Sequence, residues 1–450
     1  MRGRQWMLLA GLFVLTLPAL TSRVYSSDEI QYFSYLRSLW FDRDLSFENE
    51  YQYFYERGIA RGEGFHETFL ERQTETGRRI NFGTLGCALL WAPFYAVGDG
   101  VARLTGAPAE GFSRPYIAAV AYGSAVYGFL ALVLAGLSAR RLGLPAVGAA
   151  VAIWLGTPLI FYMYVAPVFS HACSAFAVAL FVYLWLRVRE TWTLRGGLAL
   201  GAAGALMTMV REQDAFFVAG PALDFLLWAF ARSSGLGPAV RERAGTIAAA
   251  AAAFAVVYTP QALAYLALNG HVGPHSSVGR KMNWIAPHAL QVLFSPEHGF
   301  FVWTPLALIA LAGLIGLHRR AHLAASFGLI VALQIYVSGS VESWTVAGGF
   351  GQRRFVALSA VMVIGYAAAS AVLRSSSSRG TRAAFMAVTI LAVYWNLALS
   401  AEFATGLMDR QKLEPRRNAY DAFVTLPRQA PSLIYRYFFD RASFYEARGQ

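Results

Sequence analysis

The sequence has few cysteines and few charged residues. Its only cysteines, Cys87 and Cys173, lie inside apolar runs, which excludes a disulfide framework and the ligand spacing of a zinc site. Charged residues make up 14% of the chain and hydrophobic residues 56%, which is unlike an average soluble domain. Lysine occurs only at Lys281 and Lys412, so the net charge of +12 comes almost entirely from arginine.

This basic charge does not indicate a nucleic-acid partner. No Lys/Arg-rich tract is interleaved with aromatic residues, as a nucleic-acid footprint requires. Most arginines lie in short connections between apolar runs, where basic residues mark the cytoplasmic side of a membrane. Many transporters contain internal repeats, and this sequence has no convincing one.

Apolar stretches of about 20 residues, the length that a helix needs to cross a bilayer, recur along the whole chain. Backbone polar groups in lipid must be satisfied internally, so the sequence predicts an all-α polytopic membrane protein with about eleven transmembrane helices. The first stretch also has features of a cleaved signal peptide, but the topology favours an uncleaved span. The predicted spans are Trp6–Ser22, Tyr116–Leu137, Val147–Val165, His171–Leu186, Gly196–Val210, Ala215–Phe230, Ile247–Leu268, Phe301–Leu317, Leu323–Ser338, Phe355–Leu373 and Ala384–Ala401.

The topology depends on one apolar stretch, Leu85–Val101. If it crossed the membrane, Arg140-Arg141 and the later basic connections would lie outside. If it is a juxtamembrane helix on the outer surface, those connections all become cytoplasmic, as the positive-inside rule prefers. This reading predicts a multi-pass protein of the cell (inner) membrane with a cytoplasmic N-terminus. Residues 1–402 are then expected to form the membrane domain, with the large external loop 23–115, and residues 403–450 are expected to form an external amphipathic tail.

Asp28 and Glu29 stand at the head of the large external loop, directly behind the first span. Desolvation and a like-charged neighbour both raise the pKa of a carboxyl and make its carboxylate a better base. These residues are therefore candidate catalytic residues on a substrate delivered from the lipid. Alternatively, Ser27 or Asp28 caps a helix that continues through Tyr35.

Two basic pairs, Arg280-Lys281 and Arg353-Arg354, fall in external segments against the bias of the rest of the chain. A lipid phosphate at the outer surface is the obvious ligand, because the arginine fork holds phosphate oxygens bidentately. A headgroup anchor or a salt bridge to Glu342 or Asp28 is the alternative. The glycine-rich run Gly348–Gly351 precedes the second pair and allows close approach of the backbone.

Other candidates for substrate binding are Arg211, His171 and His298. Arg211 begins a polar turn that continues to Asp214 at the external ends of two spans, where ionisable groups are usually paired or functional. For Arg211, the alternative is an ion pair with Glu212 or Asp214. For His171 and His298, the alternative is a buried histidine whose hydrogen bonds are satisfied within the protein. No spacing predicts a metal site. The acids Glu48, Glu50 and Glu56 are expected to form the solvated face of an aromatic helix.

These features together resemble the GT-C class of integral-membrane glycosyltransferases, the group that contains protein O-mannosyltransferases and the lipid A aminoarabinose transferase. The resemblance covers about the first four fifths of the chain. It rests on Asp28-Glu29 with Tyr32 and Tyr35, the juxtamembrane segment Asn81–Tyr95, Ser170-His171, the element Ser295–Pro305 and the segment Trp344–Phe355.

The resemblance implies a donor sugar on polyprenyl phosphate and transfer with inversion at the anomeric carbon. It assigns Asp28 as general base, with Glu29 supporting it or positioning the acceptor. It places Arg353 and Arg354, with Trp344 nearby, on the departing lipid phosphate. Gln31 departs from the pattern, since aminoarabinose-type members carry an arginine there, so their sugar and acceptor are not carried over.

The sequence thus predicts a polyprenyl-phosphate-sugar-dependent glycosyltransferase that modifies an envelope lipid, glycan or protein at the outer, periplasmic face. No cofactor is expected, and a divalent metal is not indicated. A transporter or flippase for a lipid-linked substrate is the alternative, and a catalytically inactive scaffold is the third. Clustering of the polar features on one face favours surface chemistry over transport.

Overall fold

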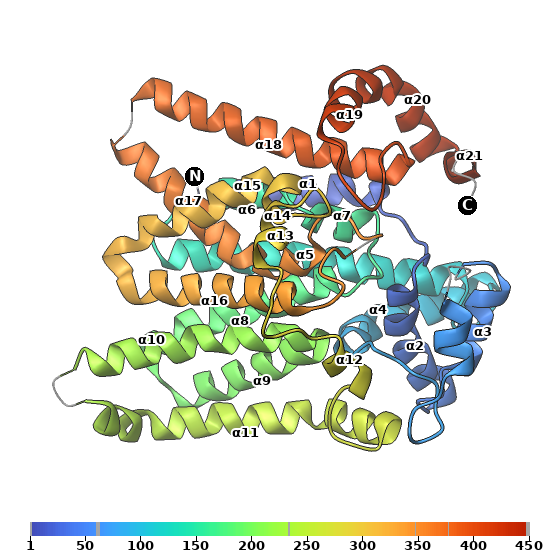
Figure 1. Cartoon of the computed structure of the whole chain (residues 1–450), viewed down its shortest axis with the longest axis horizontal. Helices are drawn as coiled ribbons and strands as arrows, with labels where there is room; N and C mark the ends of the chain where they lie inside the picture. Colours follow the sequence, from blue (N-terminus) through green and yellow to red (C-terminus); the bar gives the residue numbers. More distant parts are fainter. Residues whose placement is uncertain (1, 60–63, 233–234, 347, 377, 447–450) are drawn as a thin grey trace. The chain divides into compact units, whose positions relative to one another are not determined.

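The computed structural model describes residues 2–59, 64–232, 235–346, 348–376 and 378–446 (Figure 1). Within these residues the chain is helical and has no strand beyond one isolated bridge between Gln73 and Arg79. The all-α prediction is therefore confirmed for the described part. The chain folds as two compact units, each assembled from segments far apart in the sequence.

Unit 2 comprises Thr21–Ala131 and Ala166–Met282. It holds the loop segment 23–115, predicted to be external, and a group of long apolar helices. Its elements are α2 (Ser27–Arg37), η2 (Ser38–Asp42), α3 (Glu48–Glu56), η3 (His66–Glu71), α4 (Gly86–Thr105), the first part of α5 (Arg114–Arg141), α8 (His171–Thr191), α9 (Leu194–Val210), η4 (Glu212–Val218), α10 (Ala219–Phe230), α11 (Leu236–Asn269) and α12 (Ser276–Arg280).

Unit 1 comprises Met1–Leu20, Leu132–Val165 and Asn283–Gln450. It contains the first helix, the end of α5 and the C-terminal tail. Its other elements are α1 (Arg2–Thr16), η1 (Leu17–Ala19), α6 (Val147–Gly156), α7 (Leu159–Tyr164), α13 (Ala289–Phe294), α14 (Phe300–Trp303), α15 (Pro305–Ala312), η5 (Gly313–Arg320), α16 (Ala321–Ser340), η6 (Arg353–Leu358), α17 (Ser359–Ser376), α18 (Arg379–Thr405), α19 (Pro415–Tyr420), η7 (Asp421–Thr425), α20 (Leu426–Phe439) and α21 (Arg441–Glu446).

Six helical segments of the described chain are long and apolar enough to cross a membrane, and all lie at predicted spans. The protein is accordingly a multi-pass membrane protein, while the count of about eleven spans stays a prediction. The six segments are Arg114–Arg141, His171–Thr191, Leu236–Asn269, Pro305–Ser340, Arg353–Ser375 and Arg379–Thr405.

Helix boundaries differ from the predicted spans in two places. The predicted span Val147–Val165 is two helices, because Thr157 is extended (φ −135°, ψ 165°) and Pro158 follows it. The segment Pro305–Ser340 covers two predicted spans, and its chain reverses at Arg320, which leaves the helical region (Figure 1). The helix α4, predicted not to span, is not among the six.

Close packing in unit 2 depends on a small residue in α9. A side chain at Gly201 would place its Cβ 1.9 Å from the carbonyl oxygen of Ala250 in α11. Glycine at such a point lets two helix backbones touch, which is how helices associate when lipid offers no hydrophobic contrast.

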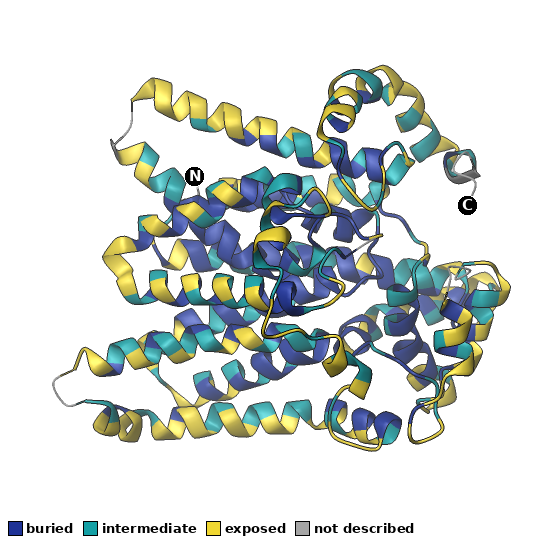
Figure 2. Ribbon diagram, in the orientation of Figure 1, coloured by how far each residue is buried: buried dark blue, intermediate teal, exposed yellow. Residues whose placement is uncertain are grey.

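The burial pattern separates central helices from lipid-facing ones (Figure 2). In unit 2, the apolar stretch of α8 is 72% buried and that of α11 only 11%. In unit 1, the segment Arg353–Ser375 is 72% buried and α18 only 33%. Both helices nevertheless expose large apolar side chains, such as Val256 and Leu263 in α11 and Met386 and Ile390 in α18, as expected for helices whose outer face contacts lipid.

The external loop has its own aromatic core, formed by Phe33, Tyr35, Phe47, Tyr51, Phe54 and Tyr95, all fully buried. The buried Arg37 donates to the Oε1 atom of Glu50 at 3.0 Å and also pairs with Asp42. Burial raises the pKa of Glu50 to about 7, and Arg37 opposes the rise. The prediction that Glu50 lies on a solvated face is therefore wrong: Glu50 is the internal partner of Arg37, while Glu48 and Glu56 are exposed.

Candidate active site

Asp28 and Glu29 begin α2, but neither is its N-cap. Ser26 is the cap: its hydroxyl accepts from the backbone N–H of Glu29 at 3.3 Å. The Glu29 carboxylate accepts in return from the backbone N–H groups of Ser26 and Tyr25, at 3.1 and 2.8 Å. This reciprocal arrangement is a capping box. The alternative that Ser27 or Asp28 caps the helix is thus wrong.

The two neighbouring carboxyls lie in different environments. Glu29 is fully buried and its Oε1 atom has no hydrogen-bond partner. Burial, with a smaller contribution from the Asp28 charge, raises the pKa of Glu29 to about 8. Asp28 is only half-buried. A pair of acids in contrasting environments can divide its roles, one neutral and structural and the other charged and reactive.

Tyr32 lies one turn along α2, within electrostatic range of both Asp28 and Arg211. Burial raises the pKa of Tyr32 above its ordinary value; the Arg211 charge and a hydrogen bond with Ser170 oppose the rise, and Asp28 adds to it. The phenol therefore keeps its proton at neutral pH. Unit 2 thus brings the acidic pair, a tyrosine hydroxyl and an arginine to one region.

Arg211 is held by His171, the first residue of α8. The guanidinium donates to Nδ1 of His171 at 2.9 Å. Arginine has no acceptor, so Nδ1 must be the acceptor and the ring proton is on Nε2. The imidazole stacks on Phe169 with ring centroids 5.7 Å apart, and Phe169 meets Tyr25 edge-on at 6.4 Å. Stacked rings thus connect Arg211 to the turn that precedes Asp28.

The acids beside Arg211 bond to other helices rather than to it. Asp214 accepts from the hydroxyl of Ser174 in α8 at 2.6 Å, and Glu212 accepts from the hydroxyl of Tyr265 in α11. Burial raises the pKa of Glu212 to about 7 and that of Asp214 to about 6. Burial therefore shifts both acids toward the protonated form.

Gln31 joins the turn of α2 that carries Asp28 to the loop before α4. Its amide donates to the carbonyl of Ser27 at 3.1 Å and accepts from the backbone N–H of Phe82 at 2.7 Å. The carbonyl of Gln31 accepts from the side chain of Asn81 at 3.0 Å. Gln31 is 4% exposed, so these bonds are shielded from water. Sequence reasoning noted Gln31 only as a departure from the family pattern and missed this role.

Arg280 and Lys281 are exposed in the same unit, at and after the end of α12. The ammonium of Lys281 lies 5.5 Å from the ring centroid of Phe82, and His275 meets the same ring at 6.1 Å. Phe82 is the residue that Gln31 binds. The basic pair therefore borders the loop that contacts the first turn of α2.

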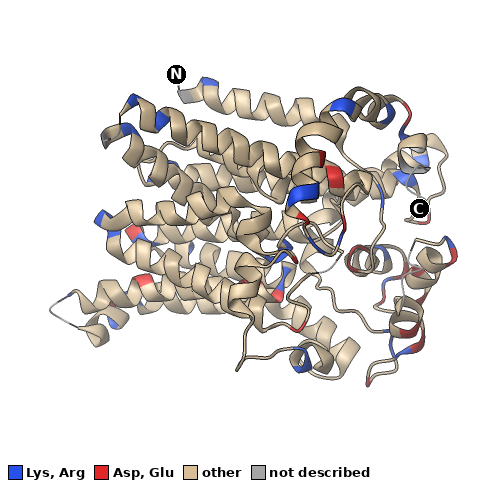
Figure 3. Ribbon diagram, turned by 45° about the horizontal axis from the view of Figure 1, so that its top comes forward, with Lys and Arg blue, Asp and Glu red and all other residues tan. Residues whose placement is uncertain are grey.

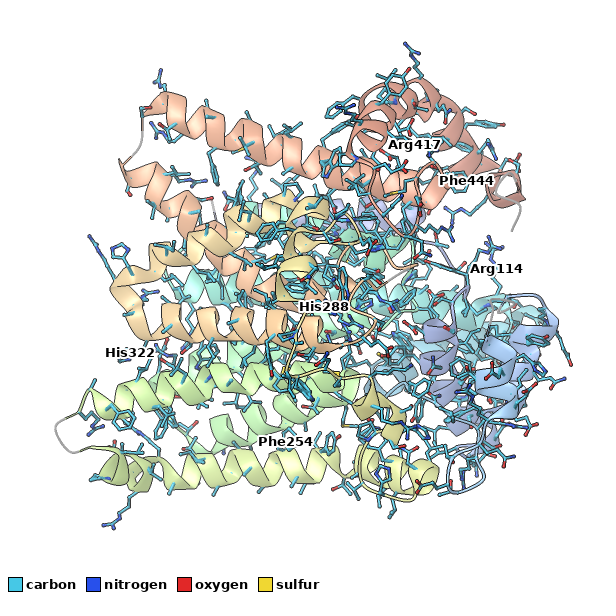
Figure 4. All side chains as sticks on the ribbon, in the orientation of Figure 1. Arg114, Phe254, His288, His322, Arg417 and Phe444 are labelled. Carbon is cyan, nitrogen blue, oxygen red and sulfur yellow. The ribbon has the colours of Figure 1, made fainter. Side chains whose placement is uncertain are left out.

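The remaining predicted residues lie together in unit 1. Arg354 donates to the carbonyl and hydroxyl oxygens of Ser343 at 3.0 and 3.1 Å, and His288, labelled in Figure 4, stacks on Trp344 at 5.4 Å. Gln352 donates to the carbonyl of Trp344 at 3.1 Å. A Cβ on Gly349 would lie 2.9 Å from Cδ of Arg353, so this glycine makes room for Arg353.

His298 is fully buried in unit 1 and stacks on Trp303 with centroids 4.5 Å apart. Burial lowers its pKa to about 4; backbone groups of Gly349 and Arg410 approach the ring and oppose this shift, but without hydrogen bonds of ordinary geometry. The ring is neutral at neutral pH. This position suits support of the Trp344–Arg354 segment better than direct contact with a phosphate.

The structure therefore groups the ten predicted site residues by unit. Unit 2 holds Asp28, Glu29, His171, Arg211, Arg280 and Lys281, and unit 1 holds His298, Trp344, Arg353 and Arg354. Their roles stay predictions. Charged residues gather at helix ends and in connecting segments, and the long helices carry few along their length (Figure 3). Among the described residues, no group of three or more His, Cys, Asp or Glu side chains is placed to hold a metal ion.

Comparison with solved structures shows the fold class. The chain is similar to ArnT from Cupriavidus metallidurans in the apo state, with a TM-score of 0.51 and 13% sequence identity. The match covers 99% of this chain and 73% of ArnT. No family model matches the chain, and no curated protein sequence matches it. The chain therefore shares its overall fold with ArnT.

Proposed function

We propose that this protein is an integral-membrane glycosyltransferase that moves a sugar from a polyprenyl-phosphate donor to an envelope acceptor, with inversion and with Asp28 as general base. The observation that carries the proposal is the arrangement in unit 2. The half-buried Asp28 lies at the start of α2 beside the buried Glu29. Tyr32 lies within electrostatic range of both Asp28 and Arg211. The GT-C fold supports the same reaction class.

The proposed step is a single displacement. The acceptor hydroxyl oxygen attacks the anomeric carbon, the bond from that carbon to the phosphate oxygen breaks, and polyprenyl phosphate leaves with the bonding electrons. The acceptor proton moves to the Asp28 carboxylate. Attack opposite the leaving group inverts the anomeric configuration. General-base catalysis of this kind contributes about 10²–10⁴-fold to the rate.

Glu29 would support this base without sharing its charge. With a pKa of about 8, Glu29 is largely protonated at neutral pH and so adds little negative charge beside Asp28. The capping box meanwhile fixes the first turn of α2. A positioned base needs such a rigid support, because misplacement by about 1 Å can cost roughly 10²-fold in rate.

Arg211 is the cation best placed in unit 2 to stabilise a departing phosphate. Its guanidinium is oriented by His171, and a fixed donor aimed at developing charge needs no reorganisation during reaction. Arg353 and Arg354 keep the phosphate role that the family resemblance assigns to them. Arg280 and Lys281, at the Phe82 loop, are proposed to contact the acceptor, which suits a negatively charged envelope lipid or glycan.

The decisive experiment is turnover of purified protein in lipid with a panel of polyprenyl-phosphate sugars. We expect wild type to release or transfer one sugar, and Asp28→Asn to bind that donor with turnover reduced about 10²–10⁴-fold. The anomeric configuration of the product, measured by NMR, tests inversion. Wild-type turnover by Asp28→Asn would remove Asp28 as the base. Substrate flux across vesicles without any turnover would favour the transporter.

A further inference from the structure

The helix α20 in unit 1 has three distinct faces. At about 100° per residue, Leu426, Ala430, Leu433 and Tyr437 share one face. Gln429, Ser432 and Arg436 share a second. The third face carries Pro427, Pro431, Ile434, Tyr435 and Phe438, with Phe439 at its edge. One polar and two apolar faces on a single surface helix mean that it has two apolar partners.

The first partner is the protein itself. Leu426 is buried and Leu433 packs with it against the cluster formed by Ala398 of α18 and Ala422 of η7. Tyr437 donates to the carbonyl of Ala19, and Phe444, labelled in Figure 4, packs edge-on against Tyr437 at 5.0 Å. Arg441 donates to the carbonyl of Leu20 at 2.9 Å. The tail is thereby fastened to the ends of α1 and α18.

Within the part of the chain that the structure describes, no neighbour buries the second apolar face. Ile434 is 57% exposed, Tyr435 62%, Phe438 46% and Phe439 78%. These side chains form a continuous stripe, since Tyr435 and Phe439 stack on each other with centroids 5.6 Å apart. An exposed stripe of this kind indicates an interaction surface.

The neighbouring helices show what covers this stripe. In α18, Met386, Val388, Ile390 and Leu391 are each more than half exposed, and α1 exposes Met7, Leu8, Val14 and Leu15. Apolar faces of this kind on membrane-spanning helices contact lipid. The tail is fastened at the C-terminal ends of these two helices (Figure 1). The exposed stripe of α20 therefore lies where the lipid-facing surfaces of α1 and α18 end.

The composition of α20 and its surroundings fits the membrane–water boundary. Tyrosine is enriched there because its ring is apolar and its hydroxyl is wet. Arg428 on α20 and Arg416 on α19 are exposed, and basic residues beside an apolar face bind anionic headgroups. This also accounts for the arginines that the tail carries against the positive-inside rule.

We propose that α20 is an interfacial helix that lies in the surface of the bilayer and inserts Ile434, Tyr435, Phe438 and Phe439 at the headgroup–acyl boundary. Its exposed arginines bind anionic lipid. This inference does not depend on the sugar, the acceptor or the catalytic base.

The test uses full-length protein in nanodiscs, labelled with an environment-sensitive fluorophore at Phe438→Cys or, as matched control, at Ser432→Cys on the polar face. The native cysteines are buried and serve as an unlabelled background in wild type. We expect the label at 438 to be quenched by lipids carrying a shallow nitroxide and shielded from aqueous iodide. The label at 432 should show the reverse.

Varying the lipid composition separates the contribution of the apolar side chains from that of the exposed arginines. Anionic nanodiscs should increase nitroxide quenching at 438 over zwitterionic ones, and Arg428→Glu should reduce that increase. Equal iodide access at 438 and 432 would overturn the proposal. So would a label at 438 that is shielded from iodide but not quenched by nitroxide lipid, since a protein partner would then cover the face. Unchanged thermal unfolding of each variant shows that the tail remains folded.

Discussion

The loop segment 23–115 and the C-terminal tail are both rich in aromatic residues, yet these residues have opposite surroundings. In the loop, Phe33, Phe47 and Phe54 are completely buried. In the tail, Tyr420, Phe423 and Phe439 are more than half exposed. Aromatic content alone therefore does not reveal whether protein or lipid is the partner. The difference lies in the polar contacts that each region makes.

The loop closes on itself through buried polar contacts. Arg37 pairs with Glu50 and Asp42, stacks over Phe112 at 4.7 Å, and donates to the carbonyl of Glu110 at 3.2 Å. The polar contacts of the tail instead bind it to the segments at the ends of α1 and α18. For example, Asn418 donates to Glu402 of α18 at 2.7 Å. One region builds its own core, and the other leaves an apolar face outward.

Removal of one ring from each region tests this contrast most strongly. Phe54→Ala should destabilise the protein by about 3–5 kcal/mol, because the substitution opens a cavity in the loop core. Phe439→Ala should change the free energy of unfolding by less than about 0.5 kcal/mol, as for an ordinary surface site. Thermal unfolding in the same detergent checks both. Similar losses in the two variants would show that the tail aromatics pack against protein.

Charged residues that contact the donor and charged residues that are only solvated should also differ in their effect on donor binding. Arg353→Ala or Arg354→Ala should weaken donor binding by about 1.5–3 kcal/mol, the value of a hydrogen bond to a charged group. Glu48→Ala, which alters an exposed acid in the loop, is the control and should leave donor affinity unchanged. Calorimetry with the donor found active above provides the measurement. Identical affinities for all three variants would remove the phosphate role of the arginine pair.

Substitution of Gln31 tests whether the loop core also positions the turn of α2 that carries Asp28. Gln31→Met keeps the volume but leaves the N–H of Phe82 without its acceptor, which costs about 1–3 kcal/mol. We expect kcat to fall about tenfold with KM nearly unchanged, because the turn is misplaced rather than the donor site lost. Gln52→Met, on the exposed face of α3, is the matched control. A change in KM alone would assign Gln31 to substrate binding instead.

The smallest effect concerns pH and the buried Glu29. Its pKa is about 8 in the folded protein against an ordinary 4.5, so the folded state holds the proton more tightly. Stability from this group is complete below pH 4.5 and is lost as pH rises through about 8. Wild type should therefore lose about 1–3 °C more in Tm between pH 6 and 9 than Glu29→Gln does. A parallel pH dependence in both proteins would contradict the buried, protonated carboxyl.

Much of the fold was predictable from the sequence because the membrane imposes it. Each predicted span overlaps helical structure, since apolar length is a local property. The break at Thr157 was missed, although Pro158 marks the position. The burial of Glu50 was also missed, because its partner Arg37 stands 13 positions away and no helical period relates the two.

For the candidate site, the sequence names candidate residues but not their contacts. Asp28 and Glu29 were found from their place behind the first span. The assignment of Ser26 as cap follows the pattern Ser-x-x-Glu, which is legible in the sequence. In contrast, the Arg211–His171 and Gln31–Phe82 bonds join residues 40 and 51 positions apart. Such pairs form only once distant helices meet, so the sequence alone names the groups and leaves their partners open.

The side-chain amide of Gln31 both donates and accepts a hydrogen bond, which has an evolutionary consequence. A side chain that only donates, such as arginine, cannot accept from the N–H of Phe82 as Gln31 does. A lineage that exchanges Gln31 for arginine must therefore remodel the segment Asn81–Gly83 as well. Among homologous sequences, position 31 and positions 81–83 should change together, so the identity of residue 31 would sort these proteins into two groups with different loops before α4.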